Sequence, residues 1–188
     1  MGKKNLKGKD ILLMLLFAPG ITEKTNEPII GKTRITKMIF VFEKEALKIF
    51  DNIDEKSMPE FFSYNYGPFS KELYDDIKFF KSIDFIKEEI TSNKMSDAEE
   101  DESYYWISEY ESDENENMQF ECKYYLTDRG KKYVEEKLWN ELSETQKQFL
   151  NDFKHKINSL TLDMLLAYVY NKYGEYTDKS KIRHKYID

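Results

Sequence analysis

Apolar residues recur at helical spacing in several separate segments of the chain. Residues 11–17 are apolar on every side, which is typical of a short buried helix, and the Ala-Pro-Gly sequence at 18–20 would end it. A second helix is predicted from Thr33 to residue 50, with Thr33 available as its cap. A third helix is expected after the Gly67-Pro68 turn, where one stripe should face the core: Phe69, Leu73, Ile77 and Phe80.

Three segments with strand-like patterns follow, at residues 84–90, 103–110 and 118–127. In the last of them apolar and polar residues alternate strictly from Met118 to Leu126, which predicts a strand with one buried face. Thr127 is placed to cap a further helix that runs to Trp139. Two more helical stretches are expected near the end of the chain, at 144–157 and 162–173.

This order of elements predicts an α+β fold with a winged-helix core, formed by three helices and a small antiparallel wing sheet. We expect residues 1–140 to form this winged-helix domain, with acidic insertions in its wing, and residues 141–188 to form a helical C-terminal extension packed on the core.

Four stretches carry a resemblance to a known family: GKTRITKMIFVF, YNYGPFSKEL, YYLTDRGKKYV and LLAYVYNKYGEYTDKSKI. They resemble the YwgA-like winged-helix family of small bacterial and archaeal proteins and, through the Tyr-Gly-Pro turn, the Panacea and SocA type antitoxin domains. The resemblance implies a regulatory or binding role, and the acidic insertions depart from it at the wing.

The charge of the chain is concentrated in one tract. Ten carboxylates lie between Asp97 and Glu116 without a Lys or Arg among them; since the formal net charge is −7, the rest of the chain carries about +3.

The chain has a single cysteine, Cys122, and therefore no internal disulfide, which favours a reducing, cytoplasmic location. Its longest apolar run, at 11–18, is far shorter than the ~20 residues of a membrane span, so no membrane association is expected.

In a winged helix, the third helix enters the major groove of DNA. This predicts a nucleic-acid-binding set on the second and third helices: Lys32, Arg34, Lys37, Ser70, Lys71, Tyr74 and Lys78. The N-terminal lysines, Lys3, Lys4, Lys7 and Lys9, are further candidates for phosphate contacts. The alternative is that these residues form an ordinary solvated surface, and the carboxylates at 72, 75 and 76 favour that alternative.

Tyrosines cluster near the C-terminus. Tyr168, Tyr170, Tyr173 and Tyr176 surround a short apolar run, and tyrosine is enriched in binding interfaces, so this segment is a candidate partner or homodimer surface. The alternative is that the segment docks against the first helix and completes the core.

The sequence contains no strong catalytic motif. Gly31-Lys32-Thr33 lacks the upstream glycine of a phosphate loop, since position 26 is Asn. Glu121 and Lys123, with Asp101 or Asp113, match a metal-dependent nuclease pattern only remotely, and their alternation favours the solvent face of a strand. His155 and His184 have no partner at a useful spacing.

We therefore expect a non-enzymatic regulatory protein without cofactor or metal, binding double-stranded DNA. The alternative is a protein-interaction module, such as an antitoxin-like partner or a phage-defence adaptor. In that case the acidic wing could imitate nucleic-acid charge towards a basic protein.

Overall fold

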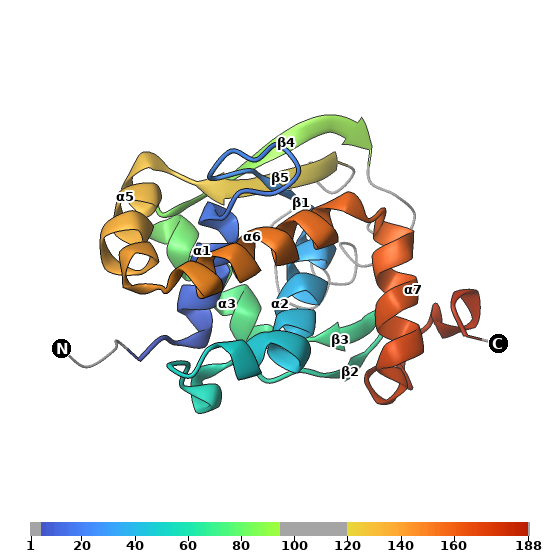
Figure 1. Ribbon diagram of the computed structural model, residues 1–188. Coiled ribbons are helices and arrows are strands. Elements are labelled where there is room, and N and C mark those ends of the chain that lie inside the picture. The colour runs from blue at the N-terminus through green and yellow to red at the C-terminus, as the bar shows by residue number, and fades with distance from the viewer. Residues whose placement is uncertain (1–4, 95–119, 188) are drawn as a thin grey trace.

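The computed structural model describes residues 5–94 and 120–187, with side chains for 5–91 and 121–187, and the fold is α+β (Figure 1). The helices are α1 (Gly8–Phe17), α2 (Lys32–Ala46), α3 (Lys71–Ser82), α5 (Asp128–Lys137), α6 (Glu144–Ser159) and α7 (Leu162–Lys172). The strands are β1 (Ile29–Ile30), β2 (Phe62–Tyr64), β3 (Gly67–Phe69), β4 (Ile86–Lys94) and β5 (Phe120–Leu126). The strand predicted at 103–110 and the acidic tract lie outside the described residues.

Helix α1 lies at the centre of the molecule. Every residue from Ile11 to Phe17 is buried, as the uniformly apolar sequence predicts, and the helix contacts β5, α5 and α6. Its N-terminal turn approaches the short helical turn at Glu55–Ser57 closely, with the Gly8 N–H donating to Ser57 Oγ at 3.0 Å. Burial of this helix on several sides explains why its sequence has no polar face.

A three-stranded antiparallel sheet, in the order β1-β5-β4, covers one side of the helices (Figure 1). Tyr124 of β5 is paired with Ile29 of β1 on one side and with Glu88 of β4 on the other. Tyr124 and Leu126 are each 1% exposed, which confirms the buried face predicted for this part of the strand. Thr127 caps α5 as predicted, its side chain accepting from the Gly130 N–H.

A second, two-stranded sheet was not predicted: the aromatic segment before α3 forms the antiparallel hairpin β2-β3. Phe62, Tyr64 and Phe69 pack on one another in it, with ring centroids 5.0 to 5.8 Å apart. Phe69 therefore belongs to β3 and not to the helix. It is nevertheless buried, as are Leu73, Ile77 and Phe80, so the prediction that this quartet faces inward is confirmed.

The second helix begins earlier than expected. Gly31, with φ of 87°, occupies the N-cap position of α2, and its N–H donates to Cys122 O at 2.8 Å; Thr33 lies inside the helix. The prediction of Thr33 as the cap is wrong because the left-handed conformation at residue 31, which glycine adopts readily, redirects the chain from β1 into the helix.

The C-terminal helices pack on the core through different partners. Helix α6 packs against α1, whereas the main helical partner of α7 is α2 and not the first helix, which the alternative interpretation of the C-terminal segment names. The tail after α7 then holds the β2-β3 hairpin: Lys181 N–H donates to Asn65 O at 2.8 Å, and Lys179 N–H donates to Ser63 Oγ at 3.0 Å. The tail thus joins the C-terminal helices to the segment that precedes α3.

A buried lysine ties α6 to the end of α1. Lys154 is 0% exposed, and its Nζ donates to three backbone carbonyls, those of Leu16, Ala18 and Glu27, at 3.0, 2.7 and 2.6 Å. Burial lowers the pKa of Lys154 to about 7, against the opposing effect of the Glu27 carboxylate. These contacts satisfy the carbonyls of Leu16 and Ala18 at the end of α1 and that of Glu27 in the loop before β1. Within the described part of the chain, no helix is long and apolar enough to cross a membrane.

Candidate functional site

Three residues of the predicted nucleic-acid-binding set are buried, so the prediction that they form a DNA-contacting surface is wrong for these three. Lys37 is 0% exposed, and its Nζ donates to Pro68 O at 3.3 Å, joining α2 to the hairpin. Ser70 is 1% exposed and caps α3, its hydroxyl accepting from the Leu73 N–H. Tyr74 is 6% exposed and packs with Phe69. As the protein is folded here, none of these three side chains presents itself to a DNA duplex.

Two further members of the predicted set, Arg34 and Lys32, direct their charged groups to partners within the protein. Arg34 Nη1 donates to Ile157 O and Leu160 O, both at 2.8 Å, and so caps the C-terminal end of α6. Lys32 is half-buried; its Nζ lies 4.9 Å from the centre of the Tyr74 ring and 4.0 Å from Glu88 Oε1. Burial raises the pKa of the Glu88 carboxyl, but Lys32, Lys81 and Tyr124 outweigh this effect and hold it below its ordinary value. Glu88 therefore partly neutralises Lys32, and the Arg34 guanidinium is held against the end of α6.

Lys71 and Lys78 are exposed on α3, but the surface of this helix is not basic. Glu72 and Asp75 are exposed beside them, and Asp76 is half-buried. Burial raises the pKa of Asp76, while Lys9 opposes the shift. The carboxylates at 72, 75 and 76 also line a cleft of about 430 Å³ with Lys7, Lys9 and Lys56. Lysines and carboxylates alternate here, so the potential that a DNA phosphate would meet is weak.

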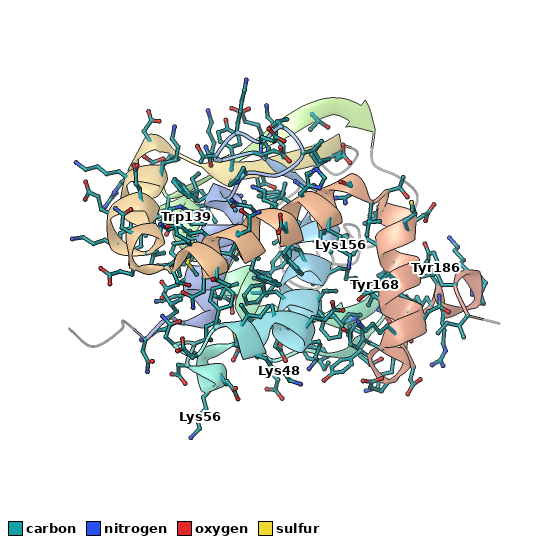
Figure 2. All side chains as sticks on the ribbon, viewed as in Figure 1. Lys48, Lys56, Trp139, Lys156, Tyr168 and Tyr186 are labelled. Atoms are coloured by element: carbon teal, nitrogen blue, oxygen red, sulfur yellow. The ribbon has the colours of Figure 1, made fainter. Side chains whose placement is uncertain are left out.

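An open groove of about 590 Å³ lies between α2, α6 and α7. Its walls are mostly apolar, formed by Val41 of α2, Phe153 and Ile157 of α6, Leu160, and Met164 and Ala167 of α7. Met164 is 56% exposed. Figure 2 shows Lys156 and Tyr168 close together where α6 and α7 approach each other, and both side chains line this groove.

A polar network around Glu45 lines part of the groove. Glu45 Oε1 accepts hydrogen bonds from Lys172 Nζ and Tyr173 Oη, both at 2.7 Å, and from the Tyr168 hydroxyl. Partial burial raises the pKa of Glu45, but these three donors outweigh it and lower the pKa. Burial and the Glu45 carboxylate raise the pKa of Tyr168, so its phenol stays protonated and donates. The network anchors α7 to α2 and contains no group poised as a base.

The tyrosines predicted as a partner surface are turned largely inward. Tyr170 is 0% exposed, hydrogen-bonded to Ser180 and packed against Tyr186, so its assignment to the surface is wrong. Tyr173 and Tyr176 are half-buried against Phe40, and Tyr176 Oη accepts from Lys44 Nζ at 2.9 Å. Of the four, Tyr168 lines the groove. Spacing revealed a tyrosine-rich segment, but not which of its faces the hairpin and tail would cover.

Those residues considered for catalysis that the structure describes are not brought together into a cluster. Lys123 pairs with Glu89 at 3.0 Å, Thr91 Oγ1 donates to the backbone oxygen of Glu121, and Asp101 and Asp113 lie outside the described residues. Burial raises the pKa of the Cys122 thiol to about 11. His155 and His184 are exposed. Over residues 5–94 and 120–187, no group of three or more His, Cys, Asp or Glu residues could hold a metal ion.

Comparisons of the chain with protein-family models, with curated proteins and with solved structures found no match.

Proposed function

We propose that this chain is a non-enzymatic protein-interaction module on a winged-helix scaffold, and that it binds its partner in the groove between α2, α6 and α7. The observation that carries this proposal is the open apolar groove, in which Met164 is 56% exposed. Exposed apolar surface of this kind, bordered by polar residues, commonly marks a protein-binding site.

The order of elements supports the scaffold. Helix α1, strand β1, helices α2 and α3, and strands β4 and β5 follow one another as in a winged helix, and the strand order β1-β5-β4 is the one expected of its wing sheet. The hairpin β2-β3 and the helices after α5 are additions to this plan. The sequence resemblance to YwgA-like proteins and to Panacea and SocA type antitoxin domains supports a role as an antitoxin-like partner or adaptor.

Site-specific cross-linking tests the proposal. A photo-reactive amino acid is placed at Met164 of the full chain in its native host, and at Glu135 as the control; Glu135 is exposed on α5, the helix at the opposite end of the molecule in Figure 1. We expect one host protein to be captured from position 164 and not from 135. The purified partner should then bind Met164→Asp at least ten-fold more weakly than Glu135→Lys. Equal capture from both positions, or no capture from 164, would contradict the proposal.

Double-stranded DNA is the second candidate, favoured by the exposure of Lys71 and Lys78 on α3. Binding through these residues would weaken steeply between 50 and 200 mM salt, and Lys71→Ala with Lys78→Ala would flatten that dependence. Because the carboxylates on the same helix oppose phosphate, we expect weak binding whose salt dependence these substitutions leave unchanged. Fluorescence anisotropy of a labelled duplex distinguishes the two results.

A further inference from the structure

We infer that the groove selects an acidic amphipathic helix of the partner protein, whose carboxylates face Lys156. This inference rests on the proposed function and adds the chemistry of the occupant. It follows from the lining of the groove, from the backbone of any segment that could fill it, and from the charges at its edge.

The lining requires apolar side chains from the occupant. Val41, Ile157, Met164 and Ala167 contribute walls from three different helices, so the groove has apolar contacts on more than one side. Met164 has a flexible, polarisable side chain that can adapt to several apolar shapes. A segment that presents apolar residues at i, i+4 and i+7 would bury them along such a groove.

The backbone of the occupant favours a helix over an extended peptide. The walls of the groove come from helices, whose backbone groups are already hydrogen-bonded, and Asn171 is the one amide side chain among the lining residues. An extended peptide over these walls would find few protein partners for its own N–H and C=O groups, whereas a helix satisfies them internally.

The charges at the edge favour carboxylates. Lys172 is paired with Glu45 at 2.7 Å, so these two groups offset each other. Lys156 is exposed, its Nζ lies 5.6 Å from the centre of the Tyr168 ring, and no carboxylate of the described residues lies within 4.0 Å of it. The edge of the groove therefore carries an excess positive charge, which a carboxylate of the partner would complement.

Selection from a displayed library of 16-residue helical peptides tests this inference. The full chain is the bait, and parallel baits carry Lys156→Glu or, as the charge-matched control, Lys132→Glu on α5, where Lys132 is 75% exposed. We expect the wild type and Lys132→Glu to enrich peptides with apolar residues at i, i+4 and i+7 flanked by Asp or Glu. Lys156→Glu should enrich Lys and Arg at those flanks instead. The best acidic peptide should bind Lys156→Glu at least ten-fold more weakly and Lys132→Glu within two-fold of wild type.

Several results would overturn the inference: enriched peptides without an acidic bias, the same peptides retained by Lys156→Glu, or enrichment of extended proline-rich peptides. These failures are separate from failure of the proposed function. A host partner captured at Met164 together with unbiased peptides would keep the function and remove the selectivity. Acidic peptides that bind without any captured partner would keep the selectivity and remove the function, and absence of both would remove both.

Discussion

The buried amine of Lys154 offers the sharpest test of the packing between α6 and α1. The substitution Lys154→Met keeps an unbranched side chain of similar length but removes the three hydrogen bonds to Leu16 O, Ala18 O and Glu27 O. A buried carbonyl left without its donor costs about 1–3 kcal/mol. Removing the amine also removes the cost of burying a cation, which is several kcal/mol. We expect the free energy of unfolding to fall by about 3 kcal/mol at pH 7, a large share of the 5–15 kcal/mol typical of a domain.

The pH dependence of this effect has a defined sign. The lysine of the unfolded chain keeps its proton up to the ordinary pKa of 10.5, whereas the folded group loses it near pH 7. The unfolded state therefore binds more protons between about pH 7 and 10.5, and this group makes the wild type more stable as pH rises, by at most about 1.4 kcal/mol per unit. The methionine variant lacks this dependence, so its deficit should widen between pH 7 and 9.

Urea unfolding followed by far-UV circular dichroism measures both effects. Lys147→Met is the control on the same helix, because the ion-pair partner of Lys147 among the described residues is Glu144, whose side chain is 90% exposed. We expect this control to change stability by less than about 0.5 kcal/mol. If Lys154→Met matched this control at pH 7, or if its deficit shrank as pH rose, the structural role assigned to Lys154 would be wrong.

Three further substitutions test other contacts, each by urea unfolding. Gly130→Ala should destabilise the protein by about 1–3 kcal/mol, because the new Cβ would lie 2.2 Å from the backbone oxygen of Phe85. Gly174→Ala is the control and should be nearly neutral, because a Cβ there would have nothing within 4 Å; equal effects of the two substitutions would refute the close approach at Gly130. Glu45→Gln should cost about 1 kcal/mol at pH 7, a modest value since Lys172 is half-exposed. Because the pKa of Glu45 is lowered from 4.5, the deficit should shrink as pH falls below 4.5 and vanish once the folded carboxyl is protonated; a deficit that stays constant as the pH falls would contradict the ionic network. Ser70→Ala should lower the free energy of unfolding by about 1 kcal/mol through loss of the α3 cap, and should leave the affinity for any DNA duplex unchanged. Reduced affinity at unchanged stability would instead show that Ser70 contacts DNA.

The helices were predictable because their signals are local. Apolar spacing placed α3 and α6 within two or three residues of their observed ends, and Thr127 was read correctly as the cap of α5. Strand β1 has two residues and the hairpin β2-β3 has three on each side, too short for alternation to be recognised. Their formation depends on partners distant in the sequence, which periodicity does not report.

The candidate site was predictable only in part, since charge alone does not reveal burial. Because lysine is seldom buried, its charge predicts a surface position for Lys37 and gives no reason to single out Lys154. A signal was available for Lys154: it lies with Leu150, Phe153 and Ile157 on one helical stripe, the face that α6 buries. The groove itself joins residues of α2 with residues more than one hundred positions later, and the sequence gives no indication that α7 would dock on α2.

The methyl spectrum of the methionines tests the central claim most directly. Met164 lines the groove, whereas Met38 is 0% exposed in the core and serves as an internal reference. The labelled full chain is titrated first with the partner captured at position 164 and then, separately, with a DNA duplex. We predict that the partner shifts the Met164 methyl signal and leaves Met38 in place, and that the duplex moves neither. A partner that binds without affecting Met164, or a duplex that perturbs the protein at physiological salt while Met164 stays fixed, would contradict the account.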